Sequence, residues 1–302
     1  MKLVKRNLLI AAVASVVSGL LLCFGAFAAM GFDFSRLNTL TFETHTYTVE
    51  DPFVNLSVDS VECDVRLLPS EDGSCKVVCR ESVQVDHTVR VVDGTLTVER
   101  TDHRHWYERI FGFHWGSMEI TVYLPESVYE TLSVTSVSGD VEVPANFSFT
   151  EAKVESTSGD VRFLASVEKD LSVKTVSGDV TVDSVRVSGT LTAKTVSGDL
   201  SLSRITCGSI NAETTSGDVD CTALRASGNL RIKTVSGDVE LRNCDGDTLW
   251  IKTISGDVSG RLLTEKRFVT DTTSGRVRVP NSASGGTCEV TTVSGDIEFT
   301  IG

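Results

Sequence analysis

The chain has 302 residues, of which 40% are hydrophobic and 23% charged, and its 28 Lys and Arg against 41 Asp and Glu give a formal net charge of −13. Residues 1–30 carry only three charged side chains, all basic, so the rest of the chain holds 25 basic and 41 acidic residues. Since phosphate binding depends on clustered Lys and Arg, this balance argues against nucleic acid and against anionic lipid headgroups as partners. The 24 Gly, with only 5 Pro and 3 Met, favour a repetitive, β-rich chain.

The N-terminus has the features of a membrane anchor. A basic stub at residues 1–7 precedes an uncharged, apolar run at residues 8–32, and a transmembrane helix needs about 20 such residues. Since basic flanks stay in the cytoplasm, we expect a single-pass protein of the cell membrane whose C-terminal part is extracytoplasmic. The alternative is a signal peptide cleaved near Ala28, which would release a secreted chain, because Ala26-Phe27-Ala28 resembles a cleavage site. A lipoprotein is disfavoured because Leu22 precedes Cys23.

An internal repeat dominates residues 131–302. Ser-Gly-Asp occurs eight times, and Ser274-Gly275-Arg276 is a variant in the same register, at steps of 19 or 20 residues. Counted from the Asp, positions −8, +1 and +3 are mostly aliphatic, which is the period-2 pattern of short β-strands. Units of this length expose apolar rows that only stacking on a neighbour can bury. The sequence therefore predicts an all-β fold, a β-solenoid of about nine coils and about 40–45 Å in length.

The Ser-Gly-Asp triplet predicts a sharp corner in each coil. We expect the glycines to supply a positive φ; they are Gly139, Gly159, Gly178, Gly198, Gly217, Gly237, Gly256, Gly275 and Gly295. We expect each Asp to accept hydrogen bonds from nearby backbone N–H groups, as in an Asx turn. The second interpretation is a ladder of cation ligands formed by the same residues, Asp140, Asp160, Asp179, Asp199, Asp218, Asp238, Asp257 and Asp296.

Two further columns of the repeat concern charge and exposure. Lysines at position −5 (Lys174, Lys194, Lys233 and Lys252) offer to neutralise the Asp column, and the Ser-Gly-Arg copy has an acidic residue there instead, Asp271. Position −3 holds Val137, Val176, Val196, Val235, Ile254 and Val293, with Thr in other copies. Strand parity points this column outward, where it would be a partner surface. We favour the alternative that the corner turns it into the core.

Residues 33–130 alternate apolar and polar positions between turn signals, which predicts an antiparallel β region that covers the start of the solenoid. The segment from Ser60 to Val65 resembles a degenerate coil corner. If residues 61–68 pair with 75–81, Cys63 faces Cys79 and a disulfide is feasible. The other cysteines of the repeat are expected to be small buried hydrophobic residues: Cys207, Cys221, Cys244 and Cys288.

The segment 102–115 breaks the pattern because it gathers aromatic and histidine side chains. His103, His105 and His114 match no standard zinc spacing, so a metal is not expected. The aromatics form a candidate interaction loop, at the membrane interface or folded onto the β surface; they are Trp106, Tyr107, Phe111, Phe113 and Trp115.

No catalytic motif occurs in the sequence, which lacks a nucleophile elbow, a P-loop, a CxxC pair and HExxH. We therefore expect a protein that is not an enzyme and needs no cofactor. The repeats, the C-terminal Cys288-Glu-Val-Thr-Thr-Val-Ser-Gly-Asp-Ile-Glu-Phe and the N-terminal anchor together resemble the bacterial putative-adhesin family, a domain of unknown function with SxSGD/TGD repeats. The resemblance covers residues 38–302 and implies a β-solenoid ectodomain at the bacterial cell envelope.

Three functions remain open at this point. A membrane-anchored scaffold or interaction module, with an envelope protein or polymer as partner, is favoured over a surface adhesin or matrix protein. The third is a calcium-stiffened structural rod. Since the C-terminal residues 299–302 offer little cap, self-association through the solenoid ends is a further hypothesis.

Overall fold

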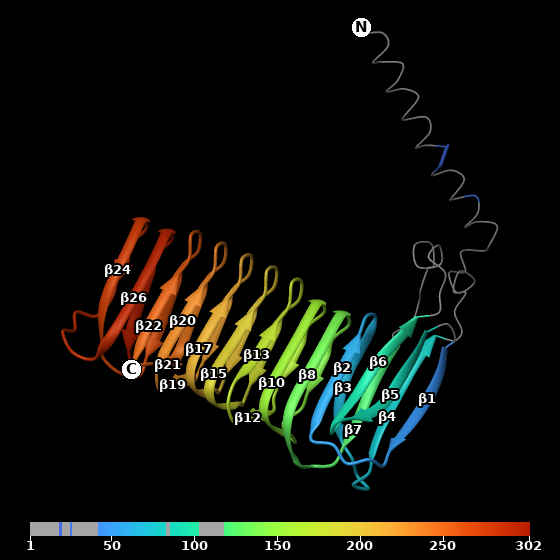
Figure 1. Cartoon of the computed structure of the whole chain (residues 1–302). Coiled ribbons are helices and arrows are strands. Elements are labelled where there is room, and N and C mark those ends of the chain that lie inside the picture. Colours follow the sequence, from blue (N-terminus) through green and yellow to red (C-terminus); the bar gives the residue numbers. More distant parts are fainter. Residues whose placement is uncertain (1–17, 20–24, 26–41, 83–84, 103–117) are drawn as a thin grey trace. The chain divides into compact units, whose positions relative to one another are not determined.

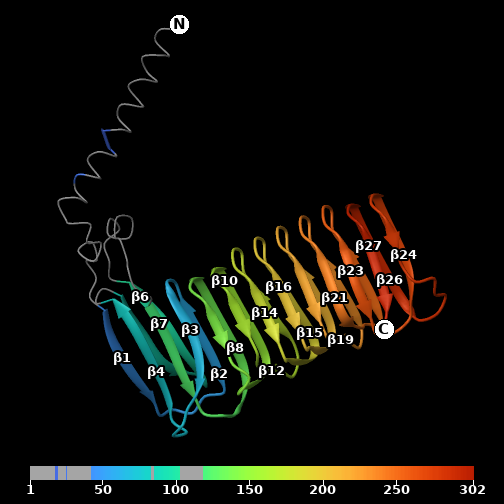
Figure 2. The same cartoon turned by 180° about the vertical axis from the view of Figure 1, so that it is seen from behind.

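Stacked parallel strands make up almost all of the chain that the structure describes (Figures 1 and 2). The computed structural model describes residues 18–19, 25, 42–82, 85–102 and 118–302. Residues 43–103 and 117–302 belong to one compact unit, and the fold below is that of the described part of this unit. Two sheets, here called sheet A and sheet B, run along the axis of the stack.

Sheet A contains 13 of the described strands, in an order that follows the axis. They are β1 (Phe42–Val49), β4 (Cys75–Ser82), β7 (Met118–Leu124), β3 (Cys63–Pro69), β9 (Val141–Val143), β11 (Val161–Phe163), β14 (Val180–Asp183), β16 (Leu200–Ser203), β18 (Val219–Thr222), β21 (Val239–Cys244), β23 (Val258–Leu262), β27 (Ile297–Ile301) and β25 (Val277–Arg278).

Sheet B contains 14 of the described strands. They are β24 (Lys266–Ser274), β26 (Gly286–Ser294), β22 (Thr248–Lys252), β20 (Asn229–Lys233), β17 (Thr206–Glu213), β15 (Arg186–Lys194), β12 (Ser166–Val167), β10 (Ser148–Ser158), β8 (Val128–Ser138), β2 (Asn55–Ser60), β6 (Thr95–Asp102) and β5 (Val85–Val92), with β13 (Leu171–Lys174) and β19 (Arg225–Ala226) beside this path.

Each coil places one strand in each sheet and stacks on the next coil in parallel register. Leu171 pairs with Leu191 in sheet B, and Val180 pairs with Leu200 in sheet A. All four side chains are fully buried between the sheets, so the columns predicted at −8 and +1 form the core. The β-solenoid predicted from the repeat is confirmed. At about 4.8 Å per strand, the 13 strands of sheet A give a rod of about 55–60 Å.

The rod is longer than nine coils because much of the N-terminal region stacks on the same axis. β2 pairs in parallel with both β8 and β6, and β3 pairs in parallel with β7 and β9. Only the β4–β7 and β5–β6 pairs are antiparallel among the pairings described for this region. The expectation of an antiparallel region is therefore correct only at its outer edge, since residues 55–69 already form a coil with its own Ser-Gly-Asp-like corner.

This arrangement also corrects the proposed disulfide. β7 lies between β3 and β4 and pairs with both, so the segments carrying Cys63 and Cys79 are not neighbours. Both thiols are free and buried. Cys207, Cys221, Cys244 and Cys288 are free and buried too, as expected of small hydrophobic residues.

Both ends of the rod are interleaved rather than stacked in sequence order. β2 and β3 lie inside the later strands β6 and β7, and the last strands, β26 and β27, lie between β22–β23 and β24–β25. Residues 299–302 are not the last layer of the stack, because β25 pairs with Ile297 and Glu298 beyond β27, although residues 299–301 pair on the β23 side alone. The end is made by β24 and β25, where Val269 and Val277 are exposed. Self-association stays a prediction that now concerns these two strands.

The corner glycines are required mainly by close stacking. Only Gly139 and Gly159 of this column have a positive φ. At every other corner, such as Gly217, a Cβ would collide with the carbonyl oxygen of the glycine one coil away. The left-handed backbone that we expected at Gly lies instead at position +5, in Ser184, Arg204, Ala223 and Asn243. The corner at Ser-Gly-Asp is thus a site of backbone packing.

Position −4 completes the corner with a buried hydroxyl. Thr195 and Thr214 are 5% and 1% exposed, and each donates a 3.1 Å hydrogen bond to the carbonyl oxygen of the glycine in the preceding coil. The first two coils of the repeat have Ser136 and Ser156 here, whose buried hydroxyls find no partner within the described residues. Threonine suits this column because its extra methyl group restricts χ1 and so holds the hydroxyl toward the glycine carbonyl.

We predict that Gly217→Ala will destabilise the rod by about 2–4 kcal/mol, because the added methyl group has only rigid backbone to displace. Denaturant unfolding measures the change. Ser216→Ala is the control, since Ser216 is exposed one position earlier. Equal stability of the two variants would show that the stacked corner tolerates a side chain.

Candidate interaction surfaces

The Asp column joins successive coils through backbone hydrogen bonds. At each corner one carboxylate oxygen accepts the N–H of the equivalent residue one coil further along, at 2.7–2.9 Å. In spatial order the acceptors are Asp64, Asp140, Asp160, Asp179, Asp199, Asp218, Asp238, Asp257 and Asp296. The expected hydrogen bond to backbone is present, but it crosses between coils instead of closing a local Asx turn.

The single Arg of this column lies at the end of the ladder. Arg276 donates its own N–H to Asp296, but no described coil follows that would need an acceptor from it. Its guanidinium folds back and donates to the second oxygen of Asp296 at 2.6 and 3.0 Å. This contact is the leading cause of the lowered pKa of Asp296. The departure from Ser-Gly-Asp therefore marks the last coil in space, although another coil follows it in sequence.

The lysines at position −5 do not contact the Asp column. Lys194 and Lys233 both lie 2.9 Å from Glu213, and Lys174 lies 3.4 Å from Glu155. These acidic residues occupy the same column in neighbouring coils. The predicted pairing of lysine with Asp is wrong because position −5 lies on sheet B, whereas the Asp begins the turn into sheet A. The inferred proximity of Asp271 to Arg276 fails for the same reason, since Arg276 pairs with Asp296.

Position −3 forms an exposed stripe of β-branched residues along the rod. Val137, Val176, Val196, Ile254 and Val293 are 43–47% exposed. The preference for a buried column was wrong, because the turn starts only after position −3 and outward parity persists to that point. The stripe is held rigidly: Ser197 donates to the Val176 carbonyl at 2.9 Å, and the same contact repeats between later coils. We call these residues, with Val235 and the intervening Thr157 and Thr215, the valine stripe.

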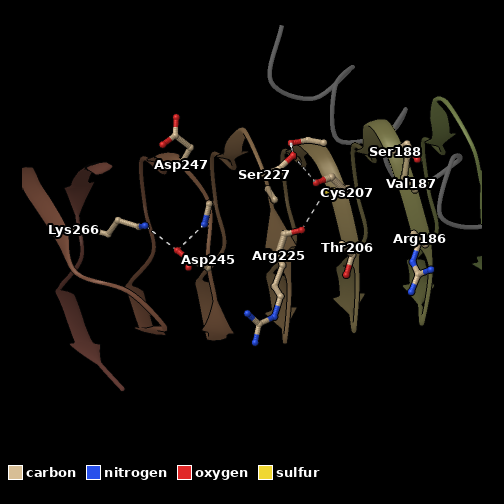
Figure 3. A pocket seen from close by; sticks show the side chains of 13 residues that line it. Arg186, Val187, Ser188, Thr206, Cys207, Arg225, Ser227, Asp245, Asp247 and Lys266 are labelled. Carbon is tan, nitrogen blue, oxygen red and sulfur yellow. Dashed lines mark hydrogen bonds and ion pairs between the residues drawn. The ribbon is translucent and has the colours of Figure 1, made fainter. Parts of the chain in front are cut away.

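A groove that the sequence did not indicate runs along the third side of the coils (Figure 3). It has a volume of about 600 Å³, and Arg186, Arg225, Asp245 and Lys266 supply its charged groups. Its floor follows a column of core residues that decreases in size along the axis. In order they are Tyr129, Phe149, Val167, Val187, Cys207, Ala226 and Gly246. Small side chains leave the later coils hollow on this side.

The far end of the groove is fixed by a buried ion pair. Lys266 is 4% exposed and lies 2.8 Å from a carboxylate oxygen of Asp245, which also accepts from Thr264 and the Gly246 N–H. Burial acts to raise the pKa of Asp245, but the hydrogen bonds from Lys266 and Thr264 outweigh it, and the pKa is lowered. Figure 3 shows Lys266 and Asp245 reaching toward one another. The Lys266 ammonium and the Asp245 carboxylate therefore stabilise the end of the groove by pairing with each other.

Comparison with known proteins agrees with the fold. Residues 53–300 match the family described as Toastrack DUF4097. The chain belongs to this Toastrack family. Its fold resembles a solved "putative adhesin" from Parabacteroides merdae ATCC 43184, at 14% identity over 87% of this chain and 98% of that one, with a TM-score of 0.53. It also resembles a "putative adhesin" from Parabacteroides distasonis ATCC 8503, at 12% identity over 86% of this chain and 98% of that one, with a TM-score of 0.52. No curated protein matches the sequence.

Several predicted sites of this Toastrack chain lie outside the described residues. The aromatic loop, with Trp106, Tyr107, Phe111, Phe113 and Trp115, is among them, as are its three histidines. The predicted anchor at 8–32 is also outside, apart from residues 18–19 and 25. Within the described part of the chain, no helix has the length and apolar character to cross a membrane. These features stay predictions.

Replacing one Asp of the Toastrack ladder distinguishes its two interpretations. We predict that Asp218→Ala costs about 1–2 kcal/mol, because the N–H of Asp238 loses its acceptor, whereas Asp218→Asn keeps an acceptor oxygen and stays near wild-type stability. Thermal melting in chelator and in millimolar calcium provides the comparison. A calcium-dependent rise in melting temperature that Asp218→Asn reduces would favour the cation ladder instead.

The lysine–glutamate column should make stability depend on acid pH. Hydrogen bonds from Lys194 and Lys233 lower the pKa of Glu213 to about 2, below the ordinary value of about 4.3. The folded state therefore binds this proton less readily than the unfolded state, and the contribution is present at neutral pH and lost as pH falls from about 5 toward 2.

We predict that Glu213→Gln costs about 0.5–1 kcal/mol at neutral pH and only a small part of that at about pH 2, where the folded carboxyl is about half protonated. Denaturant unfolding at both pH values measures this difference. Glu168→Gln is the control, because Glu168 is exposed and forms no ion pair within the described residues. A constant difference between wild type and Glu213→Gln across this range would contradict the assignment.

Proposed function

We propose that this protein is a membrane-anchored, extracytoplasmic β-solenoid that acts as a scaffold or interaction module at the bacterial cell envelope. The valine stripe is the observation that carries this proposal. It presents a β-branched side chain once per coil, Val or Ile in most coils and Thr in the others, on a backbone fixed by hydrogen bonds. Exposed apolar residues gathered along one line are typical of surfaces that bind a partner.

The charges beside the stripe favour a protein partner. The Asp column runs parallel to it, three residues further along each coil, and most of its carboxylates are exposed. These charges repel a phosphate- or carboxylate-bearing envelope polymer. They attract a protein that flanks an apolar ridge with Lys or Arg. We therefore infer that the stripe binds an envelope protein with a basic-edged apolar surface.

The predicted anchor limits where such binding takes place. Residues 31–40 extend at most about 35 Å, and the rod adds about 55–60 Å. A retained anchor thus keeps the far tip within about 95 Å of the membrane. This reach supports a role close to the membrane surface and does not suit attachment to another cell across a thick wall.

A surface adhesin or matrix protein is the second candidate, and the names of the two structural neighbours favour it. It requires that the chain be released, for which the cleavage-like residues before Ala29 offer a site. Release and retention differ in an observable way: the released chain is soluble and lacks residues 1–28, whereas the anchored chain keeps them.

Photo-crosslinking in the producing cells tests the proposal. A photoreactive amino acid is placed at Val196 in the stripe or at Thr192, which lies on the outer face of sheet B in the same coil. The cells are then fractionated, and the intact mass of the recovered chain is measured. We expect full-length chain in the membrane fraction and a discrete protein adduct from Val196 that is absent from Thr192.

A double substitution then tests whether the adduct depends on the apolar stripe. Val176→Asp and Ile254→Asp are combined, because a single change would leave most of the apolar row intact. Since both side chains are exposed, we expect a melting temperature near wild type and loss of most of the adduct at Val196. An adduct of undiminished yield, or equal adducts from Val196 and Thr192, would contradict the proposal. A soluble chain beginning near Ala29 would favour the adhesin.

A further inference from the structure

The end of the rod formed by β1, β4 and β5 contains a buried group of polar side chains that the proposed function does not use. β4 contributes Cys79 and Glu81, β5 contributes His87, and β3 contributes Cys63 from the adjoining coil. All four residues are at most 3% exposed. Elsewhere in the described rod the inward positions of the strands are predominantly aliphatic or aromatic, so this cluster differs in chemistry from the core around it.

The donor atoms of three of these residues converge. One ligand atom each from Cys79, Glu81 and His87 lies within 4.8 Å of the other two. Nδ1 of His87 contacts one carboxylate oxygen of Glu81. The sulfur and the oxygen come from β4 in sheet A, and the nitrogen comes from β5 in sheet B, the next strand in the sequence.

The surrounding groups orient the same three side chains. Cys63 Sγ lies 3.9 Å from Nε2 of His87, which leaves Nδ1 directed at Glu81. The second oxygen of Glu81 accepts from Nδ1 of His45 on β1 at 2.7 Å. Histidines that bind metals commonly use their other ring nitrogen in a hydrogen bond of this kind, and ligating carboxylates are themselves hydrogen-bonded.

We propose that Cys79, Glu81 and His87 bind a zinc ion that links the two sheets at this end of the rod. Zinc accepts thiolate, imidazole and carboxylate ligands together, and three protein ligands hold it when a water completes the tetrahedron. Binding of the ion replaces the hydrogen bond between His87 and Glu81 and releases the proton of the Cys79 thiol to solvent. Cys63 and His45 then hold the imidazole and the carboxylate from outside.

The site has a structural purpose at this position. β5 is paired on one side only, through β6, and β1 is the outermost strand of sheet A. A metal that joins β4 to β5, with His45 attached through Glu81, ties these edge strands to the rod. Structural zinc contributes its binding energy to folding.

Zinc binding to the full-length chain in detergent tests the proposal. The protein is purified in the presence of a chelator, dialysed and titrated with zinc or with cobalt. We expect about one zinc per chain and a rise in melting temperature of about 5–10 °C at zinc 100-fold above its Kd. Cobalt should give the absorption of a tetrahedral, thiolate-bound ion, a readout that needs no variant.

Matched cysteine variants identify the ligands. Cys79→Ser should abolish the cobalt–thiolate absorption and the zinc-induced rise in melting temperature. Cys221→Ser should leave both intact, because Cys221 is equally buried but lies far along the rod on β18. Cys63→Ser should retain one zinc with weaker affinity, since Cys63 contacts only His87.

Three results would overturn the assignment. In the first, the full-length chain gives neither cobalt–thiolate absorption nor a zinc-dependent shift, and the cluster is then a buried Glu–His pair. In the second, titration of the denatured chain shows that Cys79 is oxidised, and the cysteine is then part of a disulfide. Binding that survives in Cys79→Ser would count equally against it.

Discussion

The structure depends on how closely the backbone of one coil can approach the next at the Ser-Gly-Asp corner. Three side-chain positions serve this single contact. Glycine leaves room for the neighbouring carbonyl oxygen, aspartate accepts the neighbouring N–H, and threonine donates to the glycine carbonyl from the core side. The aspartate and the threonine each provide a hydrogen-bond partner to a backbone group that would otherwise have none at a sharp turn. The 19–20-residue period follows, because the corner must recur at the same point of every coil.

Because the corner residues are required for stacking, only the side chains at other positions of the coil can change without disturbing it. Ser, Gly, Asp and Thr of the corner are occupied by stacking, whereas position −3 contributes only backbone to it. Its side chain is therefore available to a partner. The groove on the third side arises differently, from a gradual loss of side-chain volume along one core column. A repeat protein can thus carry distinct surfaces on a uniform scaffold, because outward positions and core size are set independently of the corner.

The repeat made most of the fold predictable, since the period and the alternation of Leu171 and Val180 with polar neighbours specify stacked strands. Exposure of Val196 was misjudged because parity alone does not locate where a turn begins. The interleaved ends were not predictable, as local patterns contain no information on which coil stacks on which. Only Arg276, in retrospect, signals the end of the stack. Cys79, Glu81 and His87 lie within nine residues of one another, but their spacing matches no standard metal motif, and the alternation of the strands alone does not show that His87 on β5 turns back toward Glu81 on β4.

The interleaved C-terminus has a mechanical consequence. β27 pairs with β23 along its whole length and with β25 at Ile297 and Glu298, so a force on the last residues must shear the β23 row of hydrogen bonds and, at its inner end, the β25 row as well. At the other end, β1 is joined to the rod along one edge only, through β4, and can be peeled away one bond at a time. Tension applied between the two termini would therefore open the rod from the side of β1 first, while the repeat remains folded.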